Sequence, residues 1–297
     1  MKVGLSLSGG AARGMIHIGA MEELEKAGIP IDMVAGSSIG AFIGALYALN
    51  PNVQEVRKQI FKFLDEADHP LIPIELADKT ADGERRSIFK RIALNLRKTV
   101  YYGISLTQSS VISGESLREL LGRLIPDVDF AELKIPFACA ATDITNNKVY
   151  YFTEGSLLDA VTASCSIPGF FPPVSVDGMS LVDGDWAAHC HAEKLREMGS
   201  DYVIAVDIQQ GIKEEPESMS GLDIVIRSHM ATRKALSDMQ LAKADIVIQP
   251  DTCEINWWDF EESETCLLKG KAQTADQIKN IKQQLRNAKL KKFFIFR

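Results

Sequence analysis

Short apolar runs alternate with amphipathic stretches along most of the chain. The apolar runs have the length of strands and lie at Val3–Leu7, Met33–Ala35, Phe137–Ala141, Tyr202–Val206 and Ile246–Ile248. The stretches with helical spacing lie between many of them, at Met15–Ala27, Val53–Leu64, Ser116–Leu124 and Ala192–Met198. Strands that alternate with helices favour a mostly parallel sheet covered by helices on both faces. The pattern therefore predicts an α/β fold.

Two further segments are expected to add antiparallel strands to this sheet. They are Val149–Phe152 and Val174–Val182, and the second contains the tight-turn pair Asp177-Gly178. No internal repeat or low-complexity linker divides the sequence, so we expect a single domain over residues 1–297.

Two segments look like attachments to that domain. Residues 65–110 are expected to form a lid-like or helical insertion, within which Ser87–Lys98 has the pattern of a basic amphipathic helix. Such a helix either packs on the core with a solvated charged face, which base rates favour, or contacts a lipid surface. The tail, residues 289–297, is basic and then aromatic. Its sequence is compatible with contact to a membrane or to the protein's own surface.

Composition narrows the class of protein. The 297 residues are 46% hydrophobic and carry a net charge of −7, which is typical of a globular protein and argues against nucleic acid as a partner. Five cysteines without paired spacing suit a reducing compartment, so a cytoplasmic location is expected.

The uncharged stretch from Met33 to Gln54 is long enough to suggest a membrane span. Its interruption by Gly36, Ser37 and Ser38 favours a buried strand, a turn and a core helix instead.

The turn itself carries the first chemical signal. Gly36-Ser37-Ser38-Ile39-Gly40 places a glycine two positions on either side of Ser38, between an apolar run and an apolar helix. This is the pattern of a nucleophile elbow, in which a sharp strand-to-helix turn exposes the serine hydroxyl. Ser38 would also stand at a helix N-terminus, where free N–H groups favour negative charge.

A second glycine-rich turn follows the first predicted strand. It comprises Gly9, Gly10, Ala11, Ala12, Arg13 and Gly14. Its backbone N–H groups are candidates for an oxyanion hole, because glycines let successive N–H groups converge on one anion. A nucleotide phosphate loop is the alternative. The loop has no Gly-Lys-Ser/Thr ending and the Gly-x-Gly-x-x-Gly register fails at Ala11, so this alternative is disfavoured.

The base that would activate Ser38 is harder to find. A triad predicts a late histidine, and the five histidines are His17, His69, His189, His191 and His229. His17 is expected to pack in or cap the first helix, and His229 lies in a long polar helix with no matching acid signal. The segment His189-Cys190-His191 lacks a full set of metal ligands. We therefore interpret its two histidines as partly exposed residues that precede a helix. Asp183 is the better candidate, because it ends an apolar strand and precedes Gly184.

With these residues the chain resembles a bacterial patatin-like phospholipase. The resemblance rests on ordered motifs spread over most of the chain: Leu7–Gly14, Gly36–Gly40, Pro136–Asp143, Ala163–Pro173, Val182–Gly184 and Val203–Asp207. It implies a three-layer α/β/α sandwich and a Ser-Asp dyad rather than a triad. By similarity, Ser38 is the nucleophile, Asp183 the base and Gly9–Gly14 the oxyanion hole, and neither a metal nor a cofactor is needed.

Departures from the family's pattern cluster beside the base. Alanine replaces the usual glycine at Ala11, which restricts the loop but leaves its N–H group in place. The usual Asp-Gly-Gly or Asp-Gly-Ala is Asp183-Gly184-Asp185 here, and Trp186–His189 replaces a segment that usually holds asparagine and proline. If the Asp185 carboxylate faces Asp183, its charge raises the pKa of Asp183 and makes it a stronger base. The alternative is that Asp185 is an exposed turn residue.

The expected function is hydrolysis of a phospholipid, lysophospholipid or fatty-acyl ester, with peripheral contact at the inner membrane surface compatible with it. The alternative is a weakly active or inactive regulatory or binding protein with the same fold at a membrane surface, which the altered surroundings of Asp183 motivate. The oligomeric state is not predicted by the sequence.

Overall fold

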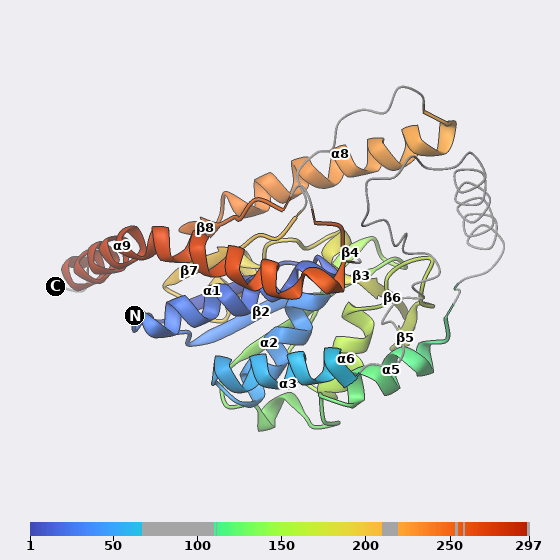
Figure 1. The fold of residues 1–297 in the computed structure, drawn as a ribbon, viewed down its shortest axis with the longest axis horizontal. Coiled ribbons are helices and arrows are strands. Elements are labelled where there is room, and N and C mark those ends of the chain that lie inside the picture. Colours follow the sequence, from blue (N-terminus) through green and yellow to red (C-terminus); the bar gives the residue numbers. More distant parts are fainter. Residues whose placement is uncertain (67–109, 111, 210–218, 253–254, 258, 296–297) are drawn as a thin grey trace.

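The computed structural model describes residues 1–66, 110, 112–209, 219–252, 255–257 and 259–295. One sheet of eight strands forms its centre (Figure 1). The strands are β1 (Val3–Leu7), β2 (Met33–Ser37), β3 (Phe137–Asp143), β4 (Lys148–Phe152), β5 (Val174–Val176), β6 (Met179–Asp183), β7 (Tyr202–Val206) and β8 (Ile246–Ile248). The five predicted apolar runs and the two antiparallel additions are therefore all strands. The predicted insertion lies almost entirely outside the described residues.

The parallel part of the sheet runs in the order β3-β2-β1-β7-β8. The three remaining strands pair antiparallel, β4 and β6 with β3, and β5 with β6. Because β1, β2 and β7 are buried along their whole length, they are apolar almost throughout rather than alternating.

Helices cover both faces of the sheet and give the three layers that the sequence predicts. The helices are α1 (Met15–Lys26), α2 (Ile39–Leu49), α3 (Val53–Glu66), α5 (Gly114–Gly122), α6 (Leu157–Ser164), α7 (Ala192–Glu197), α8 (Gly221–Leu241) and α9 (Ser263–Ile295). Leu5, Leu7 and Ile204 face the larger core, which includes residues of α1, α2, α6 and α9. Ala35, Val203 and Ala205 face a smaller core formed with α7 and the end of α8.

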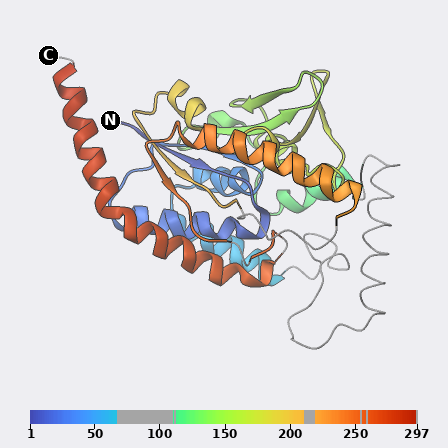
Figure 2. The same cartoon turned by 90° about the horizontal axis from the view of Figure 1, so that it is seen from above.

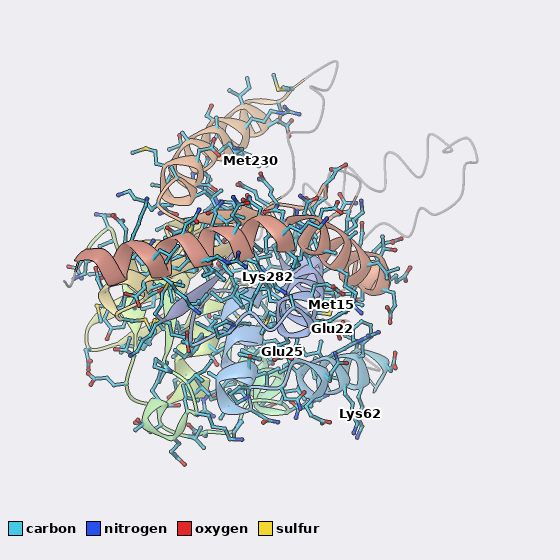
Figure 3. The ribbon with its side chains drawn as sticks, turned by 90° about the vertical axis from the view of Figure 1, so that its left-hand side faces the viewer. Met15, Glu22, Glu25, Lys62, Met230 and Lys282 are labelled. Carbon is cyan, nitrogen blue, oxygen red and sulfur yellow. The ribbon has the colours of Figure 1, made fainter. Side chains whose placement is uncertain are left out.

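Two long helices extend beyond this body. α9 packs along α1, and its C-terminal end, which includes residues 289–295 of the tail, projects past the sheet (Figures 1 and 2). Figure 3 shows this side, with Met15 and Glu22 on α1 and Lys282 on α9. Glu22 is buried and pairs with Lys271 of α9 across the contact, at 2.5 Å. Among the described helices, none combines the length and the apolar character needed to cross a membrane.

Candidate active site

Ser38 occupies the sharp turn that the sequence predicts between β2 and α2. Its backbone lies at φ 52° and ψ −125°, a strained conformation for a residue with a side chain. The flanking glycines make the turn possible. A Cβ atom on Gly36 would come within 2.5 Å of the Gly40 backbone, and one on Gly40 within 2.3 Å of the Leu7 carbonyl oxygen. The predicted elbow residues thus allow the start of α2 to pack directly against the ends of β1 and β2.

The sheet itself brings Asp183 to this turn. β2 pairs with Phe137–Ala140 of β3, and β6 pairs with Ala141–Asp143. Both lie on the same edge of β3, because β4 occupies the opposite edge. β2 therefore ends beside Ala140 while β6, running the other way, ends beside Ala141. Ser38 is the residue directly after β2, and Asp183 is the last residue of β6, so the pairing of both strands with β3 brings the two residues together.

The two side chains are in contact, and Asp183 is almost fully buried. Burial raises the pKa of the Asp183 carboxyl to about 7, the Asp185 charge adds to the rise, and a hydrogen bond from the Ser38 hydroxyl opposes it. The Asp183 backbone N–H donates to the Ser166 carbonyl oxygen at 2.9 Å, and its carboxylate accepts from the Asp185 N–H at 2.9 Å. Asp183 is therefore a fixed carboxylate that gains and loses its proton near neutral pH.

The glycine-rich loop lies beside the elbow, but its N–H groups are not equivalent. The N–H of Gly9 donates to Asp185 at 2.7 Å, that of Ala12 to the Trp257 carbonyl at 2.9 Å and that of Arg13 to the Gly10 carbonyl at 3.2 Å. Gly14 packs against Ile39 at the start of α2. Within the described residues, no hydrogen bond engages the N–H of Gly10 or Ala11, and Ala11 adopts φ 47°. These two groups are the candidates for binding an oxyanion.

Asp185 is buried, so its interpretation as an exposed turn residue is wrong. One carboxylate oxygen accepts hydrogen bonds from the Gly9 N–H, from the Ser37 hydroxyl at 3.1 Å and from His189 Nδ1 at 2.9 Å. The other oxygen pairs with the Arg233 guanidinium of α8. Although burial opposes ionisation, His189 and Arg233 hold the pKa of Asp185 far below its usual range. Asp185 is thus an anion at neutral pH beside Ser38 and Asp183.

The interpretation of His189 and His191 as partly exposed residues is also wrong, since 4% and 0% of their surfaces are accessible. His189 lies between Asp185 and Asp207. His191 contacts the Tyr151 hydroxyl at 3.1 Å through Nδ1, and burial lowers its pKa to about 4. Among the described residues, no group of three His, Cys, Asp or Glu side chains could hold a metal ion.

Sequence reasoning assigned no role to Asp207 or Arg233. Asp207 follows the apolar strand β7 directly, which is the same signal that identified Asp183 after β6. Arg233 gives no comparable signal, because it lies within a long helix and only the fold brings it to Asp185. Its neighbour His229 stacks on Trp186 with ring centroids 4.8 Å apart.

The fold and the site together define an α/β protein with a serine on a nucleophile elbow and an aspartate within hydrogen-bond reach. The family model of the patatin-like phospholipases matches residues 5–189. This match covers well over half of the chain, and the chain belongs to that family.

Curated relatives come from fungi and mammals. A lysophospholipase, nte1, of Emericella nidulans is 32% identical over 228 residues, which are 75% of this chain and 13% of the relative. The patatin-like phospholipase domain-containing protein 6 of Mus musculus is 31% identical over 208 residues, 69% of this chain and 13% of the relative. The chain thus spans about an eighth of the length of these relatives. They support the family but not the bacterial branch that the sequence suggested.

Solved structures share the fold at low sequence identity. Human GIVD cytosolic phospholipase A2 aligns with a TM-score of 0.53 and 11% identity, over 97% of this chain and 60% of that protein. VipD from Legionella pneumophila aligns with a TM-score of 0.50 and 15% identity, over 94% of this chain and 67% of that protein.

Proposed function

We propose that this protein hydrolyses a phospholipid, lysophospholipid or other fatty-acyl ester through a Ser38–Asp183 dyad. The observation that carries the proposal is the contact between the Ser38 hydroxyl and a buried carboxylate whose pKa is about 7. A general base is most effective when its pKa lies near the working pH. Lysophospholipids are the first substrate to test, because the fungal relatives are named lysophospholipases.

The geometry supports a two-step reaction. Asp183 takes the proton of Ser38 as its oxygen attacks the ester carbonyl, and the N–H groups of Gly10 and Ala11 bind the resulting oxyanion. The tetrahedral intermediate collapses to an acyl-enzyme, and the alcohol leaves with the proton that Asp183 returns. Water activated by Asp183 then attacks the acyl-enzyme and releases the fatty acid. These side chains and N–H groups are sufficient for the reaction without a cofactor.

A short-chain nitrophenyl ester and a fluorophosphonate probe test the proposal. Ser38→Ala should abolish both ester hydrolysis and labelling, whereas Ser175→Ala, which removes an exposed hydroxyl on β5, should change neither. Hydrolysis by Ser38→Ala at the wild-type rate would exclude the mechanism. A folded wild-type protein that the probe does not label would favour the regulatory or binding protein instead.

We further propose that the outer face of α8 contacts the lipid surface. Five of the nine large hydrophobic side chains exposed on the described residues lie on this helix: Ile224, Val225, Met230, Leu236 and Met239. Positions 224, 225, 228, 231, 232, 235, 236 and 239 share one side of the helix and carry no charge. Met230, which is labelled on α8 in Figure 3, lies on a different side of the helix from these positions.

Lipid is the occupant that this helix fits best. Arg227 and Lys234 lie along one edge of the uncharged side, where Lys234 also pairs with Asp238, and a helix with an apolar face and basic residues beside it is typical of one that lies in a membrane surface. Its inner side contacts the segment after β6, where Arg233 pairs with Asp185 and the Gln240 amide donates to the Ala187 carbonyl oxygen. Of the two segments that the sequence suggested, Ser87–Lys98 lies outside the described residues, so its contact with lipid stays a prediction. In the tail, Leu290 is exposed.

Vesicle binding tests this contact without requiring turnover. In the Ser38→Ala background, Val225→Glu combined with Met239→Glu should abolish co-flotation with vesicles of phosphatidylcholine and phosphatidylglycerol. Leu268→Glu is the matched control, because Leu268 is 60% exposed on α9. Equal binding by all three proteins would refute the role of α8. A loss of self-association rather than of vesicle binding would assign the face to a second copy of the chain.

A further inference from the structure

A chain of ionised side chains runs behind the proposed oxyanion loop. His189 contacts Asp185 through Nδ1 at 2.9 Å and Asp207 through Nε2 at 2.7 Å. Asp207 also accepts hydrogen bonds from the Gln209 N–H at 2.8 Å and from the Gln249 amide at 2.6 Å. Each of the three charged side chains is more than nine-tenths buried. They link the ends of β6 and β7.

Contacts with two ionised carboxylates assign a proton to both ring nitrogens of His189. A neutral imidazole has one nitrogen without a proton, and here its lone pair would face a carboxylate oxygen at less than 3 Å. The doubly protonated ring donates to both carboxylates instead. Burial disfavours this charge, yet Asp185 and Asp207 overcome burial and raise the pKa of His189 to about 9.

The other charged or titratable groups around His189 do not alter this assignment. Arg233 from α8 and Arg13 from the loop are cations that interact with Asp185. His17 of α1 and His191 lie near enough to interact with His189, and burial lowers the pKa of each to about 4. They are therefore neutral near neutral pH, and His189 is the charged histidine of this cluster.

Asp185 connects His189 to the glycine-rich loop and to the turn that holds Ser38. The same carboxylate oxygen that binds His189 also accepts from the Gly9 N–H and the Ser37 hydroxyl. Gly9 immediately precedes the two free N–H groups, and Ser37 immediately precedes Ser38. Gly9 is pressed against Asp185 so closely that a Cβ atom there would lie 2.6 Å from the Asp185 Cβ. One oxygen atom thus joins the proposed oxyanion loop to the elbow.

We infer that His189, as an imidazolium held between Asp185 and Asp207, is a positioning residue that keeps the oxyanion loop aligned with Ser38. This inference rests on the proposed ester hydrolysis. It replaces the interpretation of Asp185 as only a neighbour that tunes Asp183. Loss of the imidazolium leaves two buried carboxylates without their shared cation, so Asp185 moves or takes up a proton and its hold on Gly9 and Ser37 weakens.

A role confined to stability makes a different prediction from a positioning role. Misalignment of N–H groups that bind only the transition state lowers kcat while KM changes little. A misplacement of about 1 Å costs on the order of 100-fold in rate. Deprotonation of His189 should have the same effect in the wild-type protein as the pH rises through about 9.

The test compares His189→Gln with His191→Gln in the full chain. His191 is equally buried but does not contact Asp185, so it controls for the loss of a buried imidazole. We expect His189→Gln to lower kcat on a soluble nitrophenyl ester by roughly 10- to 100-fold, with KM changed by less than about threefold. The wild type and His191→Gln should lose activity as the pH rises through about 9, and this decline should be absent from His189→Gln. Equal kcat and equal alkaline declines in all three proteins would overturn the inference.

A second measurement is independent of turnover and of whether His189→Gln folds. In Ser38→Ala protein with isotopically labelled histidine, NMR should show one doubly protonated imidazole that titrates near pH 9, and Asp207→Asn should lower that value. A His189 that is neutral near neutral pH would refute the inference even if the ester is hydrolysed. Hydrolysis by Ser38→Ala would instead refute the proposed function and leave the charge of His189 measurable.

Discussion

Asp183 should reduce the stability of the protein at the pH where it acts as a base. Folding raises the pKa of this carboxyl from 3.8 to about 7, so the folded state holds one more proton than the unfolded state between these values. Stability falls with rising pH wherever the folded state binds more protons. The shift of about 3 pH units corresponds to about 4 kcal/mol of lost stability above pH 7, at roughly 1.4 kcal/mol per unit.

Asp183→Asn should therefore stabilise the fold while it abolishes hydrolysis. The amide has the size of the protonated acid and retains an acceptor for the Asp185 N–H. Its advantage should be small near pH 4, should grow by roughly 1.4 kcal/mol per pH unit and should level off above about pH 7, with about 4 kcal/mol as the upper limit. Urea unfolding at a series of pH values measures this difference directly.

Asp143→Asn provides the control with the opposite sign. Burial favours the protonated form of Asp143, but hydrogen bonds from Asn146 and the Thr145 N–H hold its pKa below the usual value. Removing this charge should destabilise the fold at neutral pH. If Asp183→Asn is equally or less stable than the wild type above pH 7, the carboxylate is not strained by burial and the reasoning fails.

Three further predictions concern the dyad and the loop. Hydrolysis by the wild type should increase as the pH rises through about 7, because Asp183 must be ionised to accept the Ser38 proton; a rate independent of pH from about 5 to 8 would contradict this. Asp185→Ala removes a negative neighbour and should shift that increase to lower pH by roughly one unit, whereas an unchanged pH–rate profile would exclude Asp185 from tuning the base. Gly9→Ala should lower kcat by roughly tenfold, because its methyl group collides with Asp185; Gly122→Ala, whose methyl group would lie 3.5 Å from Leu158, should retain the wild-type rate.

The sequence predicted the parts of the site that depend on local geometry. Ser38 was identifiable because the close backbone contacts of the turn require glycine at positions 36 and 40, which leaves a recognisable pattern around the serine. The strands were identifiable because buried strands have continuous apolar runs, and predicted boundaries differ from those observed by at most two residues for β1, β2 and β7.

The parts that depend on distant segments could not be predicted. His189 was expected to be partly exposed, and an exposed turn was one of two interpretations of Asp185, since Asp207 and Arg233, which pair with these residues, are distant in the sequence. Asp207 follows β7 and Arg233 lies on α8, and only the folded sheet brings them together. The uncharged outer side of α8 was missed for a related reason, because the sequence does not show which side of a helix the body leaves uncovered.

The cluster behind the loop has a consequence for how sequences of this kind change over time. Aspartate at position 185 without a cation at 189 would keep only Arg233 as its counter-ion, and histidine at 189 without its acidic neighbours would lose its proton. Each substitution alone is expected to destabilise the fold, because breaking a buried ion pair costs about 3–5 kcal/mol. The order in which such replacements accumulate is therefore constrained, and inherited variants at positions 185, 189 and 207 should arise and disappear as a set.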